Sequence, residues 1–231
     1  MEPLMTLYIP ERSVVPKSEF DDPIDYYYRP LTGWVYRDRL ENSLHMLGDE
    51  RSESLLEVGY GSGLLLPELS RRTRRLVGID IHGQADEVYR MLEHERVQAK
   101  LHQASLYEMP FDDEEFDALA CFSVLEHLTD LDAAFREFAR VTRPGAVIAL
   151  GFPARNLVTD SFFWVAGYNP RKLHPSSHRD IERAILRQPM LRLDRVRTFP
   201  AYVPAALSLY YSCRCVRVDP ARSRADTVSA S

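Results

Sequence analysis

The stretch Leu55-Leu56-Glu57-Val58-Gly59-Tyr60-Gly61-Ser62-Gly63 decides the fold of this 231-residue chain. A short apolar run over residues 54–58 ends in three closely spaced glycines, and residues 64–72 then have the apolar spacing of a helix. Glycine allows a tight turn and a close approach to a ligand, and the first turn of a helix presents N–H groups that have no partner within the helix. The stretch therefore predicts a strand, a ligand-binding turn and a helix.

The spacing of the glycines narrows the choice of ligand. A dinucleotide fingerprint reads G-x-G-x-x-G, whereas here Gly63 comes one residue early and Leu64 takes the dinucleotide position. A phosphate-binding loop needs Gly-Lys-Ser/Thr, which this stretch lacks. Asp80 ends the next apolar run, where a carboxylate can accept hydrogen bonds from both hydroxyls of a ribose. We therefore predict a ligand that contains a ribose but no pyrophosphate; the alternative for Asp80 is a solvated loop aspartate.

Apolar runs and helical patterns alternate along the rest of the chain. The further expected strands are residues 76–81, 101–104, 117–122, 146–152, 191–199 and 207–218, and the expected helices are residues 32–47, 86–96, 180–188 and a clear one from Asp130 to the Pro144-Gly145 stop. Continuously apolar strands separated by helices are typical of a parallel sheet covered on both faces. The last two strands form a hairpin-like pair, which would add an antiparallel edge to that sheet.

The composition excludes several classes of protein. Hydrophobic residues make up 45% and charged residues 27%, which excludes disordered, collagen-like and disulfide-dense chains. The 29 basic and 34 acidic residues give a net charge of −5, which argues against an obligate nucleic-acid binder. The charge is uneven, because residues 171–224 hold 12 basic and 4 acidic residues whereas residues 1–170 hold 17 and 29.

The cysteines and the apolar runs bear on the cellular setting. Cys121, Cys213 and Cys215 lack the spacing of a metal site, and the last two would share one face of a strand without bridging. Such cysteines indicate reduced thiols and a cytoplasmic protein. The apolar runs fall short of the ~18–20 residues of a membrane helix, and residues 4–9 lack the basic flank of a secretory signal.

Four further motifs follow the glycine stretch in a fixed order. They are Gly78-Ile79-Asp80, Met109-Pro110-Phe111 with Phe116-Asp117, Val124-Leu125-Glu126-His127, and Arg143-Pro144-Gly145. Together with Glu57–Gly63 they resemble, in order and spacing, the class I S-adenosylmethionine-dependent methyltransferases. More narrowly, the chain resembles the branch, of the methyltransferase type 11 kind, that modifies small molecules, lipids and quinones. The resemblance covers residues 50–153 and fades on both sides, where this family recognises its substrates.

The resemblance implies S-adenosylmethionine as the cofactor. The residues that it places around the cofactor are Glu57, Gly59, Tyr60, Gly61, Gly63, Asp80, Ile81, Ser105, Leu106, Phe122 and Ser123. Of these, Asp80 would hold the ribose, Ile81 would pack against the adenine, and Ser123 with its neighbour would face the transferable methyl group. Two residues depart from the family pattern, because Ser105 stands where an aspartate is usual and Tyr60 replaces a small residue, narrowing the pocket near the methionine tail.

The expected reaction needs few catalytic groups from the protein. Methyl transfer from a sulfonium is an in-line displacement on an activated electrophile, so the protein mainly positions the reactants and excludes water. A general base matters only if the attacking atom carries a proton of high pKa. His127, which follows the fourth strand, is the candidate base; alternatively it only orders the start of the next helix. Glu126, His127, His174 and His178 offer ligand atoms for a metal, but we expect no metal site and assign His174 and His178 to substrate contacts.

Aromatic side chains flank the region of resemblance on both sides. The candidate substrate residues are Tyr27, Tyr28, Trp164, His174 and His178. The tyrosines would close over the site as part of an N-terminal arm, or alternatively attach that arm to the core. Trp164 belongs to an aromatic segment that forms either a substrate lid or packing.

The expected domain organisation and function follow from these features. Residues 1–49 form an arm and cap helix, residues 50–218 the methyltransferase domain with a substrate-cap insertion at 154–180, and residues 219–231 a disordered tail. The fold class is α/β, a Rossmann-like three-layer sandwich with a mostly parallel seven-stranded sheet and an antiparallel edge strand.

The expected activity is methylation of a small-molecule acceptor at oxygen or nitrogen. The basic C-terminal third favours an anionic acceptor, such as a metabolite or a lipid or glycan precursor. Two alternatives stay open, an RNA or protein methyltransferase and a non-catalytic binding protein of the same fold. A homodimer is also left open.

Overall fold

The structure is a computed structural model that describes residues 7–17, 24–30, 33–156, 174–201 and 207–219. The strands are β1 (Ser52–Val58), β2 (Thr73–Asp80), β3 (Lys100–Gln103), β4 (Phe116–Phe122), β5 (Thr142–Pro153), β6 (Leu191–Phe199) and β7 (Tyr210–Arg217). The helices are α1 (Ile24–Tyr28), α2 (Gly33–Leu44), α3 (Leu66–Ser70), α4 (Ala85–His94), the 3₁₀ turn η1 (Leu125–His127), α5 (Leu131–Val141) and α8 (His178–Arg187). The expected disordered tail lies outside the described residues apart from Asp219, as does most of the expected insertion.

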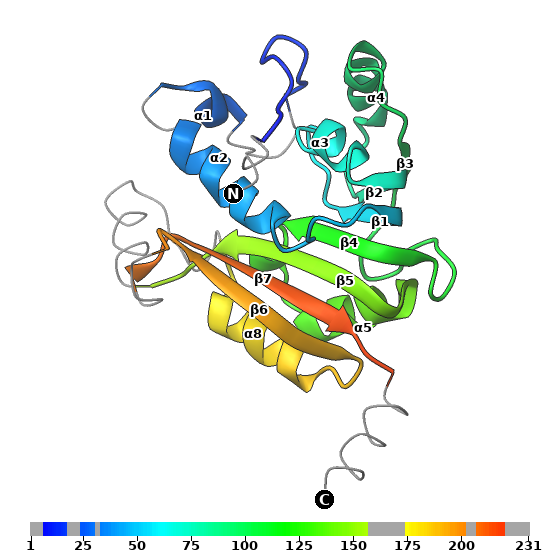
Figure 1. Ribbon diagram of the computed structural model, residues 1–231, viewed down its shortest axis with the longest axis vertical. Helices are drawn as coiled ribbons and strands as arrows, with labels where there is room; N and C mark the ends of the chain where they lie inside the picture. The colour runs from blue at the N-terminus through cyan, green and yellow to red at the C-terminus, as the bar shows by residue number, and fades with distance from the viewer. Residues whose placement is uncertain (1–6, 18–23, 31–32, 157–173, 202–206, 220–231) are drawn as a thin grey trace, which may run out of the picture.

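The seven strands form one sheet in the order β3-β2-β1-β4-β5-β7-β6 (Figure 1). The first five strands in this order are parallel to one another, whereas β7 is antiparallel to both β5 and β6. The prediction of a mostly parallel sheet with an antiparallel edge is confirmed, and the reversed strand is β7, with β6 beyond it. Because the chain winds outward in both directions from β1 and β4, the carboxyl ends of these strands flank a crevice, where open α/β sheets bind ligands.

Helices cover both faces of the sheet and make it the middle of three layers (Figure 1). On one face, α5 and α8 bury Phe135, Phe138 and Ile181 in one hydrophobic cluster. On the other face, α2, α3 and α4 bury a second cluster, which includes Leu44 and Leu66. The strands between the two clusters are buried on both sides, which explains why they read as continuous apolar runs.

Two local expectations were wrong. The helix expected over residues 64–72 is only the five-residue α3, because Ser52 already pairs with Thr73 and the chain must enter β2 at once. The Pro144-Gly145 stop does not separate helix from strand, because β5 begins at Thr142 directly after α5. The pairing of β4 with β5 shifts register between Phe116 and Ala118, and this irregularity accommodates the proline and glycine.

Two observations concern the cysteines and the length of the helices. Cys121, Cys213 and Cys215 are free and buried, and the two on β7 lie in the same hydrophobic cluster. Among the described residues, no helix is both long and apolar enough to cross a membrane.

Candidate functional site

The glycine turn connects β1 to α3 at the carboxyl edge of the sheet. Gly59, Gly61 and Gly63 all have positive φ angles, of 78°, 51° and 77°. The Gly59 N–H donates to the Ile79 carbonyl over 2.8 Å, and a Cβ atom on Gly59 would lie 2.2 Å from Cγ2 of Val124. The glycines are therefore required by the turn itself, before any ligand is considered.

Asp80 is the last residue of β2 and reaches directly to the glycine turn. Its Oδ2 accepts from the Gly61 N–H over 2.8 Å, and its Oδ1 accepts from the Ile81 N–H over 2.7 Å. Because β1 and β2 are parallel neighbours, their carboxyl ends meet, and the carboxylate lies where the sequence places the ribose. The ribose role stays a prediction.

His82 belongs to the same cluster, and the sequence analysis missed it. The ring is buried, with Nε2 2.8 Å from the Gly61 carbonyl oxygen and 3.6 Å from Oδ2 of Asp80. Its position two residues after Asp80 was the one available signal. Tyr60 packs its ring against His82, 4.9 Å between centroids, and against Gly78 of β2. The Tyr60 ring therefore packs against β2. That Tyr60 narrows the pocket near the methionine tail of the cofactor stays a prediction.

Glu57 is a buried acid beside the glycine turn. It is 5% exposed, and its Oε2 has no hydrogen-bond partner. Burial, assisted by the nearby charge of Asp80, raises the pKa of Glu57 to about 8. The side chain is consequently a neutral acid at pH 7 in the ligand-free protein, and an ammonium group beside it would favour the carboxylate.

This buried acid leads to a prediction about proton release. If Glu57 meets the amino group of the cofactor, S-adenosylhomocysteine binding at pH 7 releases roughly 0.9 of a proton, because a group of pKa about 8 is then mostly protonated before binding. The affinity accordingly rises between about pH 6 and 8. Calorimetry in buffers of different ionisation enthalpy measures the release. Glu57→Gln should bind S-adenosylhomocysteine more weakly and without proton release; an unchanged proton release in this variant would contradict the assignment of Glu57 to the amino group.

The residues expected around the adenine lie at an exposed edge of the site. Ile81 is 61% exposed directly after Asp80, an apolar surface that suits a flat aromatic ring. Ser105 follows β3 and is exposed, with its Oγ accepting from the Tyr107 N–H over 3.2 Å. Leu106 is partly buried against the core. The serine hydroxyl thus has a local partner and, unlike an aspartate, brings no charge to this edge.

The end of β4 is held rigidly. Phe122 is buried, and Ser123 follows with a φ of +56°, an uncommon angle for a serine. The Ser123 N–H donates to the Gly151 carbonyl over 2.7 Å, and its Oγ lies 3.2 Å from the Tyr210 hydroxyl of β7. Backbone strain of this kind collects at functional sites, in agreement with the expected place of the methyl group.

Glu126, His127 and His174 converge just beyond this point. Each offers one ligand atom, and these atoms lie within 4.8 Å of one another. Glu126 is 2% exposed and burial raises its pKa to about 8, whereas the His127 side chain is 51% exposed. The His127 and His174 rings lie 5.2 Å apart. The structure therefore joins His174 to the candidate base, and the expectation of no metal stays a prediction.

His178 lies apart from these histidines. It is the first residue of α8, is buried, and packs beside the Tyr211 ring at 5.9 Å. Burial lowers its pKa, so it stays neutral at pH 7. The sequence grouped His178 with His174, but the helix that begins at His178 carries it into the packing between α8 and β7.

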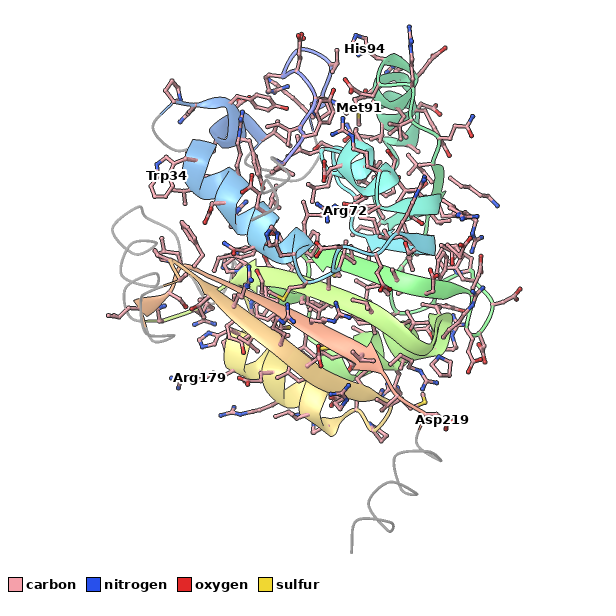
Figure 2. The ribbon with its side chains drawn as sticks, in the orientation of Figure 1. Trp34, Arg72, Met91, His94, Arg179 and Asp219 are labelled. Atoms are coloured by element: carbon pink, nitrogen blue, oxygen red, sulfur yellow. The ribbon has the colours of Figure 1, made fainter. Side chains whose placement is uncertain are left out.

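The two candidate tyrosines of the arm lie in different surroundings. The Tyr28 hydroxyl donates to the Pro10 carbonyl over 2.7 Å, which attaches one part of the arm to another. Tyr27 is buried and its hydroxyl accepts from Nη2 of Arg39 over 2.8 Å. Trp164 lies outside the described residues. Trp34, close by in the chain, is 63% exposed on the outer side of α2 (Figure 2).

Arg39 and Tyr210 are further residues that the sequence analysis missed. They come from α2 and β7, and the Arg39 guanidinium carbon lies 5.3 Å from the centroid of the Tyr210 ring. No short motif links positions so far apart in the chain, so only the fold brings them together.

Comparisons with known proteins agree with this geometry. A family model described as a methyltransferase domain matches residues 56–150. The ubiquinone biosynthesis O-methyltransferase of Alkalilimnicola ehrlichii is 35% identical over 121 residues, which are 51% of this chain and 49% of that protein. The 2-phytyl-1,4-naphtoquinone methyltransferase of Trichormus variabilis is 28% identical over 143 residues, 56% of this chain and 61% of that protein. The chain thus spans about half or somewhat more of the length of these curated relatives.

Solved structures show the same fold at low identity. The geranyl diphosphate C-methyltransferase of Streptomyces coelicolor superposes with a TM-score of 0.68 at 18% identity, covering 90% of this chain and 88% of that one. The N-methyltransferase NodS of Bradyrhizobium japonicum gives a TM-score of 0.63 at 18% identity, covering 90% and 97%. Residues 56–150 therefore match a methyltransferase domain model, and the described chain has the fold of these solved methyltransferases.

Proposed function

We propose that this chain is an S-adenosylmethionine-dependent methyltransferase that acts on oxygen or nitrogen of a small-molecule acceptor. The observation that carries the proposal is the meeting, at one sheet edge, of the glycine turn, the Asp80 carboxylate and the unpartnered acid Glu57. Asp80 suits a ribose, Glu57 suits an amino group, and the exposed Ile81 directly after Asp80 suits an adenine ring. The names of the curated relatives, ubiquinone biosynthesis O-methyltransferases, favour oxygen.

The chain's own residues have separable tasks in this reaction. Asp80 binds the ribose of the cofactor, and Glu57 compensates the positive charge of its amino group. Ser123 and Tyr210 fix the end of β4, which orients the acceptor toward the cofactor and excludes water. When bound, S-adenosylmethionine supplies a methyl group on a positively charged sulfur.

His127 is the proposed proton acceptor for an acceptor hydroxyl. Its ring follows β4, is half exposed, and lies with Nε2 4.0 Å from Oε1 of Glu126. An exposed imidazole can pass a proton on to solvent, which a buried one cannot do easily. The alternative is a role in ordering η1, supported by the bond from the His127 N–H to the Val124 carbonyl.

The proposed cellular setting is the cytoplasm, and the proposed partner is a small molecule. Free and buried thiols support a reducing, cytoplasmic environment. The acceptor is proposed to be a small molecule, because the net charge of −5 does not suit a nucleic acid.

Cofactor titration followed by a turnover assay tests the function. We expect the full chain to bind both S-adenosylmethionine and S-adenosylhomocysteine by calorimetry, and to release S-adenosylhomocysteine only when a small phenolic acceptor such as catechol or 3,4-dihydroxybenzoate is added. Absence of cofactor binding would leave a non-catalytic protein of this fold. Turnover on RNA but on no small molecule would contradict the acceptor class.

A further inference from the structure

His82 lies in the short loop that leads from β2 to α4, directly behind the glycine turn. Its side chain is 1% exposed, so neither ring nitrogen can rely on water for a hydrogen bond. Nε2 lies 2.8 Å from the Gly61 carbonyl oxygen, and Nδ1 lies 3.1 Å from the backbone nitrogen of Gln84, which precedes the first turn of α4. Both ring nitrogens are therefore engaged by the backbone, one in the glycine turn and one at the start of α4.

These two partners decide which ring nitrogen carries the hydrogen. A backbone N–H can only donate, so Nδ1 must accept from the Gln84 N–H. A carbonyl oxygen can only accept, so Nε2 must carry the hydrogen and donate it to Gly61. An imidazole with its one hydrogen on Nε2 satisfies both partners at once, whereas the opposite tautomer satisfies neither of them.

The Asp80 carboxylate is the other acceptor within reach of His82. Three backbone N–H groups already donate to this carboxylate, those of Gly61, Ile81 and His82 itself. A fourth donor from the protein would compete directly with a ribose hydroxyl, because a carboxylate has about four acceptor sites. Nε2 of His82 lies 3.6 Å from Oδ2 of Asp80, beyond hydrogen-bond distance, since its hydrogen goes to the Gly61 carbonyl instead.

Gly61 is consequently held on both of its backbone polar groups. Its N–H donates to Asp80 and its carbonyl accepts from His82, at a φ of 51° that favours glycine. The Tyr60 ring packs edge-on against the imidazole, with 4.9 Å between the centroids and 79° between the ring planes. The glycine turn, the carboxylate and the imidazole thus form one unit in the ligand-free protein, and such preorganisation increases the affinity for a ligand.

We propose that His82 is a positioning residue for the cofactor, which holds the Gly61 carbonyl through Nε2 and thereby keeps the Asp80 carboxylate open for the ribose. This inference rests on the proposed methyltransferase function. A histidine that only ordered the start of α4 would need Nδ1 alone. The tasks of the two ring nitrogens can therefore be tested separately.

Two substitutions separate the two ring nitrogens. His82→Asn keeps an acceptor for the Gln84 N–H, two residues further on, but is too short to donate to Gly61. His82→Gln has a longer side chain whose amide can donate to the Gly61 carbonyl. In calorimetry with the full chain, His82→Asn should bind S-adenosylhomocysteine about tenfold more weakly than wild type, the scale of one buried hydrogen bond, and His82→Gln should stay within about threefold.

A ribose readout separates positioning from a merely structural role. Wild type should prefer S-adenosylhomocysteine over its 2′-deoxy analogue by at least about tenfold, the scale of one hydrogen bond to a charged group. His82→Asn should reduce this preference at least about threefold, because Asp80 is no longer held open, whereas His82→Gln should keep it. A general loss of structure would weaken both ligands and leave their ratio unchanged.

His94→Asn is the matched control. His94 ends α4 with an exposed ring, 3.4 Å from Oε1 of Glu95, and its replacement should leave both affinities and their ratio unchanged. Thermal unfolding is measured for every variant. If His82→Asn does not fold, His82→Gln and the tautomer of wild type decide the question.

The tautomer is measured on wild type by long-range ¹H–¹⁵N correlation of the histidine rings. The signals of His82 are those missing from His82→Gln, and they should show the hydrogen on Nε2 and none on Nδ1.

Three outcomes would overturn the inference. The first is a hydrogen on Nδ1 of His82. The second is His82→Asn that binds S-adenosylhomocysteine as tightly as wild type, or His82→Gln that loses the preference for the ribose form. The third is an affinity that falls in His82→Asn while the ratio between the two ligands stays the same. Failure of wild type to bind S-adenosylhomocysteine at all would refute the proposed function itself, a result distinct from these three.

Discussion

Asp80→Ala is expected to lower the affinity for S-adenosylhomocysteine at least about 100-fold, because the proposed ribose site would lose two hydrogen bonds to a charged group, each contributing roughly 1.5–3 kcal/mol. The carboxylate lies at the carboxyl end of β2 and already accepts from the Gly61 N–H over 2.8 Å. Its removal therefore also releases the glycine turn. Calorimetric titration of the purified variant measures the loss directly.

Two companion variants make the result specific. Asp80→Asn keeps an acceptor oxygen without the charge, so we expect an intermediate affinity. Asp86→Ala removes an exposed carboxylate from the first turn of α4, six residues further on, and should leave the affinity unchanged. A loss of less than about tenfold in Asp80→Ala, the scale of one hydrogen bond, would place the ribose elsewhere.

Gly59→Ala is expected to destabilise the fold by about 3 kcal/mol or more and to eliminate cofactor binding. Two costs combine at this position. A side chain at a φ of +78° costs roughly 1–2 kcal/mol, and the added Cβ would lie 2.2 Å from Cγ2 of Val124, so the end of β4 must move. Urea unfolding followed by circular dichroism measures the change in the free energy of unfolding.

Gly145→Ala separates the two costs. Gly145 has a φ of +89°, but no described atom outside its chain neighbours lies within 4 Å of its added Cβ, so this variant should show the conformational cost alone. In the double variant Gly59→Ala with Val124→Ala, part of the loss should be recovered, because the clashing methyl group is gone. Equal destabilisation by the two single glycine variants would contradict the close approach of Val124.

Some parts of the fold and site could be predicted because their signals are local. The glycine turn and Asp80 each follow a strand directly, and parallel neighbours bring such ends together without further information. The two strands expected over residues 191–199 and 207–218 are joined by a short loop, which allowed the pair β6 and β7 to be predicted. In contrast, the length of α3 depended on the pairing of Ser52 with Thr73, which no helical pattern contains.

The surroundings of Arg39 were beyond sequence reasoning for a different reason. Arg39 is one of many arginines in the chain, and only the fold brings it to the Tyr210 ring of β7. The uneven charge of the sequence indicated the C-terminal third instead. The described arginines of that third lie largely on α8 and β6, and their role toward an acceptor stays a prediction.

The position of β7 also sets the order in which the chain can finish folding during synthesis. The ribosome makes β6 before β7, yet in the described sheet β6 pairs only with β7, which separates it from β5. Until Arg217 has been made, β5 therefore has an open edge and β6 has no neighbour, and unpaired strand edges of this kind attract other chains. The nascent protein must pass through a stage in which most of its core is complete but its sheet is not, and we expect chaperones to be needed at that stage.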